Sequence, residues 1–168
     1  MHVAALAGLA VTGARDDEAA PIEEGFRARA LTAAEGFLRM TREGIDHYGD
    51  LETLVVYLTV VSAGGGRALR DPDTLGRHGG ADPLPEGYYR PVSRRAVAAA
   101  AGLPRETVRR KIAWLAERGM VEDAGRAGVR ATHNVLALGE NLAFARGLVA
   151  AFDSTCERLA RLERDGAA

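Results

Sequence analysis

Residues 92–132 read VSRRAVAAAAGLPRETVRRKIAWLAERGMVEDAGRAGVRAT, and this stretch decides the fold. It predicts two short helices around a glycine turn, followed by a glycine-rich hairpin that carries arginine. Ser93 is expected to cap the first helix, which ends at Gly102 because glycine accepts the left-handed backbone of a tight turn. Pro104 suits the first position of the second helix, which is predicted to run to Arg118. Such a pair of helices is typical of a helix-turn-helix.

The second of these helices has two different faces. Its apolar side chains fall at helical spacing and are predicted to pack inward: Val108, Ile112 and Leu115. The opposite face presents donors and acceptors that can discriminate bases, from Arg105, Glu106, Arg109 and Arg110. The alternative is an ordinary solvated helix face, with a weak surface pair between Glu106 and Arg110.

The residues that follow favour recognition of a nucleic acid. Val121–Ala124 and Val129–Thr132 are predicted to pair across a turn at residues 125–128. Arg126 at the tip and Arg130 on the returning strand are then placed to touch phosphate or a minor groove. The alternative interpretation is an ordinary hairpin turn.

Together these residues resemble the bacterial winged helix-turn-helix transcriptional regulators, the broad set that includes the MarR-like, IclR-like and GntR-like groups. The resemblance rests on the arrangement AxxxGLPRETVRRKIxxLxxxGMV, residues 98–121, and on the glycine-bearing wing. It implies that the helix from residue 104 to 118 enters the major groove and that the wing contacts the DNA backbone or the minor groove. Residues implied near bases are Arg105, Glu106, Arg109 and Arg110.

The same resemblance implies a set of residues close to phosphate: Ser93, Arg94, Arg95, Thr107 and Lys111. The chain departs from the family pattern at Pro104. A serine or threonine usually stands there, so one expected cap and phosphate contact is absent.

Charge is distributed unevenly along the chain. Residues 90–130 hold ten Lys or Arg against four Asp or Glu, whereas the whole chain has a net charge of −1. A basic module on an otherwise acidic body favours approach to a polyanion through one face, as expected for a regulator that reads a site. A uniformly basic nucleoid protein is therefore disfavoured.

Composition sets the outer limits. The chain has 168 residues, of which 47% are hydrophobic, enough for one good core or a small domain with dimerisation helices. Cys156 is the single cysteine, which excludes an internal disulfide and suits a reducing cytosol. No apolar run approaches the roughly twenty residues of a membrane span. Nearly all basic residues are arginine, which indicates a GC-rich bacterial genome. From the short apolar runs and the single cysteine we expect a soluble, cytoplasmic protein.

The first half of the chain predicts helices. Residues 1–20 are expected to be frayed or loosely packed, and residues 21–71 to hold two helices. The first is predicted from Pro21 to about Tyr48, with a possible second start where Thr32 and Glu35 fit a capping box. Asp50 is expected to cap the second helix, which continues to near Leu69 and joins the winged-helix core.

Residues 72–91 are rich in proline and glycine, so they predict a loop with one short turn of helix. Tyr88 and Tyr89 within this loop are expected to anchor it to the domain surface. Stacking on a ligand or a base is the alternative.

The last predicted helix covers residues 139–165 and carries an apolar seam whose spacing alternates between three and four residues. This pattern suits a dimerisation helix, through Leu148, Phe152, Leu159 and Leu162. Packing on the chain's own N-terminal helices is the alternative.

Candidate catalytic groups are few. The four histidines are scattered without metal-ligand spacing, so the sequence nominates no catalytic residue, no metal site and no cofactor. The predicted fold class is mainly α, with a three-helix core, a small β-hairpin wing (residues 92–133 with the preceding helix) and flanking N- and C-terminal helices. The expected partners are double-stranded DNA and a second copy of the chain. The sequence does not exclude a small-molecule effector and does not identify one. The alternative function is a winged-helix module that binds protein.

Overall fold

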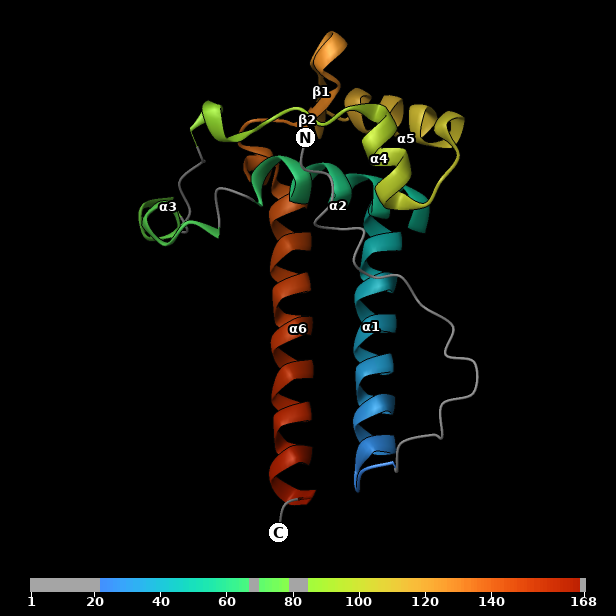
Figure 1. Ribbon diagram of the computed structural model, residues 1–168, viewed down its shortest axis with the longest axis vertical. Coiled ribbons are helices and arrows are strands. Elements are labelled where there is room, and N and C mark those ends of the chain that lie inside the picture. Colours follow the sequence, from blue (N-terminus) through green and yellow to red (C-terminus); the bar gives the residue numbers. More distant parts are fainter. Residues whose placement is uncertain (1–21, 67–69, 79–84, 167–168) are drawn as a thin grey trace.

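The computed structural model describes residues 22–66, 70–78 and 85–166, so the expectation for residues 1–20 lies outside the described part. The fold is mainly helical with one two-stranded antiparallel sheet. Figure 1 shows two long helices standing side by side, with the remaining elements gathered at one end. The elements in order are α1 Phe26–Tyr48, α2 Leu51–Gly65, α3 Pro72–His78, η2 Glu86–Tyr88, α4 Arg94–Ala101, α5 Arg105–Glu117, β1 Val121–Asp123, η3 Gly125–Ala127, β2 Val129–Ala131, η4 Val135–Ala137 and α6 Gly139–Gly166. We call α1 with α6 the stem, and α2, α4, α5, β1 and β2 the head.

The head is built around α2. Asp50 caps this helix as predicted, because its Oδ1 accepts a hydrogen bond of 2.8 Å from the Thr53 amide. The helix ends at Gly65, earlier than expected, and residues 67–69 lie outside the described part. Val56 and Val60 are fully buried in the head core. The same core takes side chains from every other element of the head: Val97, Val108, Ile112, Leu115, Val121 and Val129.

The two helices α4 and α5 meet at a tight turn. Ser93 caps α4 as predicted, its Oγ accepting from the Ala96 amide at 3.1 Å, and Gly102 ends the helix with a φ of 66°. α5 starts at Arg105 and ends at Glu117, one residue inside each predicted end, because Pro104 and Arg118 are its caps rather than helical residues. The predicted inward face is confirmed, since its three apolar side chains are buried.

The hairpin forms as predicted, with Glu122 opposite Arg130 in the register. Val92 extends it as an isolated bridge, exchanging hydrogen bonds of 2.8 and 2.9 Å with Val129. This pairing ties the hairpin to the start of α4. Gly128 is required there, since it has a φ of 117° and a Cβ would overlap the Val92 carbonyl oxygen.

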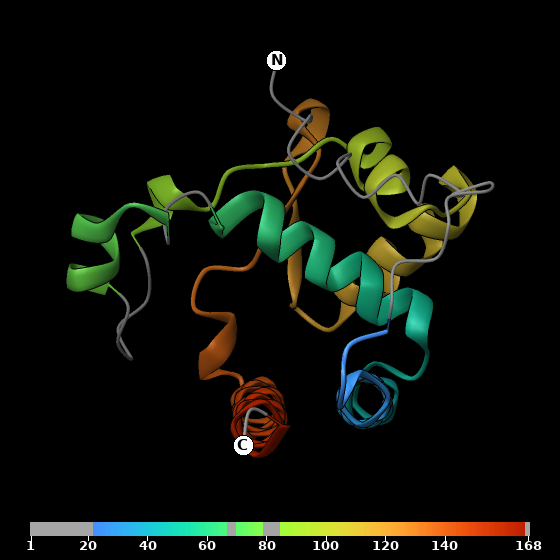
Figure 2. The ribbon, with the colours of Figure 1, turned by 60° about the horizontal axis from the view of Figure 1, so that its bottom comes forward.

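The stem is an antiparallel helix pair, seen end-on in Figure 2. Gly36 of α1 is buried directly against Thr155 of α6, and Arg158 of α6 bonds Glu35 of α1 at 2.9 Å. α1 is continuous through Thr32, so the predicted second start is wrong. The Thr32 side chain is 7% exposed, buried within the helix rather than capping a helix start.

This packing bears on the seam predicted for dimerisation. Leu148 and Leu162 lie seven residues on either side of Thr155, hence on the face that meets α1, and both are half-buried. Phe152 is 50% exposed and Leu159 is half-buried. The sequence predicted that these four residues form an intermolecular seam, with packing on the chain's own N-terminal helices as the alternative. In the structure, α6 turns part of this seam toward α1 of the same chain.

The segment between α2 and α4 contains a seven-residue helix, α3, where one short turn was expected. Tyr88 lies 6.0 Å from His78 and Tyr89 lies 5.5 Å from His133, measured between ring centroids. Tyr89 thus contacts a residue outside this segment, as the anchoring interpretation predicts, whereas the ring partner of Tyr88 lies within the segment itself. Within the described residues, no helix combines the length and the apolarity needed to cross a membrane.

Candidate nucleic-acid interface

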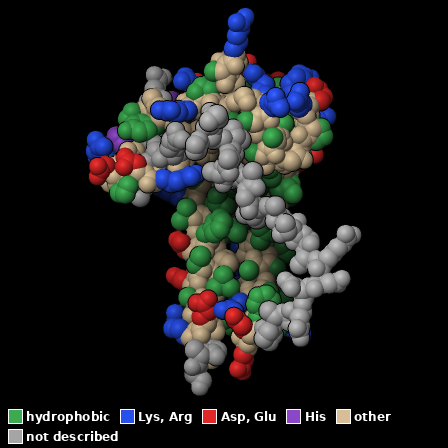
Figure 3. All heavy atoms as spheres, in the orientation of Figure 1, with side chains coloured by type: hydrophobic (Ala, Val, Ile, Leu, Met, Phe, Trp, Pro, Cys, Tyr) green, Lys and Arg blue, Asp and Glu red, His purple; other side chains and the backbone are tan. Residues whose placement is uncertain are grey.

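The outward face of α5 carries the side chains predicted to read bases. Arg105, Glu106, Arg109 and Arg110 are all exposed. They lie on the side of the helix away from its buried apolar face because residues repeat every 3.6 positions. Figure 3 shows basic side chains over this end of the molecule, around α4 and α5 and at the end of the hairpin.

Glu106 forms a two-point ion pair with Arg109. The carboxylate accepts from Arg109 Nε at 2.9 Å and from Nη2 at 2.6 Å. The hydrogen bond from Arg109 lowers the pKa of Glu106, and the same bond raises the pKa of Arg109. The surface pair suggested by the sequence was with Arg110, so the partner differs. Each Glu106 oxygen accepts one hydrogen bond from Arg109 and keeps a second lone pair that can accept from a cytosine amino group.

Among the predicted base, phosphate and wing contacts, four exposed arginines form no ion pair with any described residue: Arg95 on α4, Arg105 and Arg110 on α5, and Arg126 at the hairpin tip. Their guanidinium groups remain available to an anion. An arginine has five N–H donors and keeps its charge at any physiological pH, which suits it to guanine edges and to phosphate.

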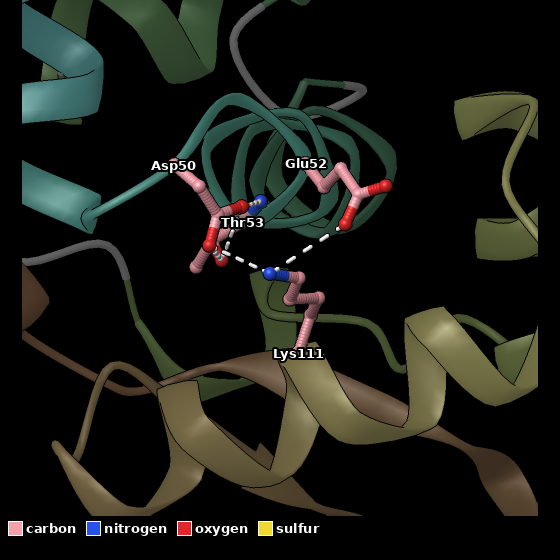
Figure 4. Close-up of polar contacts among 4 residues, drawn as sticks. All are labelled: Asp50, Glu52, Thr53 and Lys111. Carbon is pink, nitrogen blue, oxygen red and sulfur yellow. Dashed lines mark hydrogen bonds and ion pairs between the residues drawn. The ribbon is translucent and has the colours of Figure 1, made fainter.

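Lys111 lies differently from the resemblance-based expectation. Its ammonium group bonds Asp50 Oδ2 at 2.6 Å and lies 3.6 Å from Glu52 Oε2, and its side chain is only 13% exposed (Figure 4). Partial burial alone would raise the pKa of Asp50, but hydrogen bonds from Lys111 and Thr53 outweigh it and lower that pKa. Lys111 therefore joins α5 to the start of α2 and is turned away from the surface that holds the exposed arginines.

Two further arginines of the predicted set are engaged within the chain. Arg94 pairs with Asp123 at 2.8 Å and donates to the Gly125 carbonyl at 3.4 Å, which links α4 to the hairpin. Arg130 pairs with Glu122 across the two strands at 2.9 Å. Ser93 uses its hydroxyl oxygen as the α4 cap, and Thr107 is half-buried. Of the predicted phosphate and wing contacts, Arg95 and Arg126 are the most accessible cations.

A separate open hollow of about 600 Å³ lies where the stem joins the head, on α1 and α6. It is lined by Glu43, Asp46, His47, Glu140, Ala143, Phe144 and Gly147. His47 stacks on Phe144 at 5.0 Å and shares a 2.8 Å hydrogen bond with Asn141. In the described part of the chain, no three His, Cys, Asp or Glu residues are grouped to hold a metal ion.

Sequence reasoning missed the contacts that orient this surface. Lys111 and Asp50 are 61 residues apart, and Arg94 and Gly125 are 31 apart. No local spacing connects such residues. The one usable signal was Asp50 itself, since a capping aspartate keeps an oxygen free for a second donor.

Comparison with known proteins finds no match to a family model, to a curated protein or to a solved structure.

Proposed function

We propose that this protein is a sequence-specific double-stranded DNA-binding transcriptional regulator in which α2, α4, α5 and the hairpin act as a winged helix-turn-helix. The observation that carries the proposal is the set of exposed, unpaired arginines, which sits on α4, α5 and the hairpin tip. α5 follows a tight glycine turn and exposes the polar side chains of Arg105, Glu106, Arg109 and Arg110 in its first half. Those properties suit a helix that lies in a major groove.

In this proposal Arg105 and Arg110 read base edges, and Arg109 is oriented by Glu106 for the same purpose. Arg95 and Arg126 bind phosphate or the minor groove on either side. Lys111 and Arg94 hold α5 and the hairpin in place from behind. The protein acts by binding, without chemistry.

The test is a binding selection from random duplex DNA at controlled salt, followed by sequencing. We expect an enriched motif, and an affinity that falls steeply as salt rises because counterions are released from phosphate. Arg110→Ala should weaken binding to the motif roughly tenfold to a hundredfold and relax the preference at one position. Arg126→Ala should weaken binding to all sequences to a similar degree.

Arg39→Ala is the matched control, since Arg39 is an exposed arginine on the stem. It should leave DNA binding unchanged. Absence of any DNA retention, or retention that salt does not weaken, would contradict the proposal and favour a winged-helix module that binds protein.

A further inference from the structure

The stem leaves a row of large apolar side chains in solvent. Those on α1 and α6 that are between 36% and 65% exposed are Phe26, Leu31, Phe37, Leu38, Ile45, Leu142, Val149 and Phe152. We call these eight residues the stem face. Monomeric proteins rarely expose contiguous apolar patches this rich, and such patches mark sites of association. Figure 3 shows hydrophobic side chains along both helices of the stem.

Helix geometry brings part of the stem face to one side. The Thr155 side chain of α6 packs against the backbone of Gly36 on α1, so these two positions face each other across the stem. Around the axis of α1, Phe37 lies about 100° from Gly36. Around the axis of α6, Phe152 lies about 60° from Thr155. Because α1 and α6 run in opposite directions, these two rotations carry both rings to the same side and the same level of the stem. Val149 and Leu142 continue this side along α6 toward the head.

Three further residues of the stem face lie on the outer edge of α1. Leu31, Leu38 and Ile45 repeat every seven residues, so they form one line on that helix. Thr32 and Gly36, which are buried, lie on the other side of α1. The internal contact with α6 therefore leaves this line uncovered.

The exposed area suits a stable interface between proteins. Three phenylalanines, each with about 150–250 Å² of surface and about half of it exposed, contribute roughly 300 Å² of aromatic surface. Five aliphatic side chains add to it. A standard interface buries about 800 Å² on each partner, and only its centre is strictly apolar. The stem face is large enough to supply that apolar centre.

We propose that the occupant of the stem face is the stem face of a second copy of this chain, in a homodimer related by a two-fold axis. A two-fold interface uses the same patch on both subunits, so a patch that is apolar throughout is complementary to itself. The two helices of each copy then form a four-helix arrangement that covers the side of the stem on which Phe37, Val149 and Phe152 lie. This surface lies on the stem, apart from the arginines of the head, so the inference does not depend on DNA binding.

The test is sedimentation velocity of the full chain without DNA, over a range of concentrations. We expect the wild-type protein to be a dimer and the double variant Phe37→Glu, Phe152→Glu to be a folded monomer. Leu136→Glu is the matched control, because Leu136 is also 50% exposed but belongs to η4, outside the stem. It should remain a dimer, and circular dichroism should show equal helix content in all three proteins.

The thiol of Cys156 gives a second measurement that needs no variant. Cys156 is exposed in the single chain and lies one turn beyond Phe152 on α6. Its reaction with a thiol reagent should be slow at concentrations where the dimer forms and should accelerate on dilution. A monomeric wild-type protein, a double variant that stays dimeric, or a thiol whose rate ignores concentration would each overturn the proposal.

Discussion

The role of a basic residue in this chain depends on the direction in which its helix turns it. Arg110 and Lys111 are adjacent on α5, yet Arg110 points to solvent while Lys111 lies between Asp50 and Glu52. A step of one residue rotates the side chain by about 100°, which is enough to move it from the outer surface to the contact with α2. Asp50 thus serves two purposes, since it caps α2 and fixes α5 against it.

Lys111→Met should lower the free energy of unfolding by about 1–2 kcal/mol, because it leaves a partly buried carboxylate without its cation. Urea denaturation measures the change. Arg110→Met is the control and should change stability by less than about 0.5 kcal/mol, since Arg110 is exposed and unpaired. If Lys111→Met left stability unchanged but reduced DNA affinity, Lys111 would instead be the phosphate contact that the family resemblance implies.

Asp50 also predicts a dependence of stability on pH. Its pKa in the folded protein lies below the ordinary value of 3.8, which the unfolded chain approaches. The stabilisation is therefore present above pH 3.8 and is lost as the pH falls through the lower folded pKa. Asp50→Asn should show a smaller loss of stability than the wild type over this acidic range, in denaturation curves recorded at several pH values. Parallel pH profiles for the two proteins would contradict the prediction.

At the scale of the elements, the hairpin depends on a single glycine. Gly128→Ala should destabilise the protein by about 3 kcal/mol or more, because alanine disfavours a φ of 117° and its Cβ would meet the Val92 backbone. Gly119→Ala is an informative comparison. Gly119 has a φ of 66° with nothing within 4 Å of a Cβ, so only the backbone cost of about 1 kcal/mol applies. Thermal or urea denaturation should rank the two variants in this order, and equal losses would be evidence against the Val92 contact.

The elements differ in how far the sequence predicts them. Local signals located α4, α5 and the hairpin to within about two residues, because caps, the Gly102 turn and the inward apolar face all act within one element. The surface of the candidate site followed from the same helical spacing. The partners of its charged residues did not, since they come from other elements. The apolar spacing of α6 likewise predicted a packing helix but carried no information on which chain would cover it.

At the scale of the whole molecule, the two proposals assign DNA binding to the head and association with a second copy to the stem. The exposed arginines that we assign to DNA lie on the head, and the exposed apolar surface that we assign to a second copy lies on the stem. If both proposals hold, one dimer carries two heads and reads two half-sites whose spacing is fixed by the stems. The affinity for paired half-sites then exceeds that for one half-site without any additional contact.

This arrangement predicts how the monomeric double variant Phe37→Glu, Phe152→Glu will bind DNA. Its affinity for a single half-site should match that of one wild-type head, because no residue of the head has changed. Its affinity for the paired site should fall by about a hundredfold or more, since the second head no longer binds from the same molecule. Fluorescence anisotropy with single-site and paired-site duplexes separates the two effects, with Leu136→Glu as the control that keeps both affinities. Equal losses on both duplexes would show that the stem face acts through the stability of the head, and an undiminished paired-site affinity would show that the two heads bind independently.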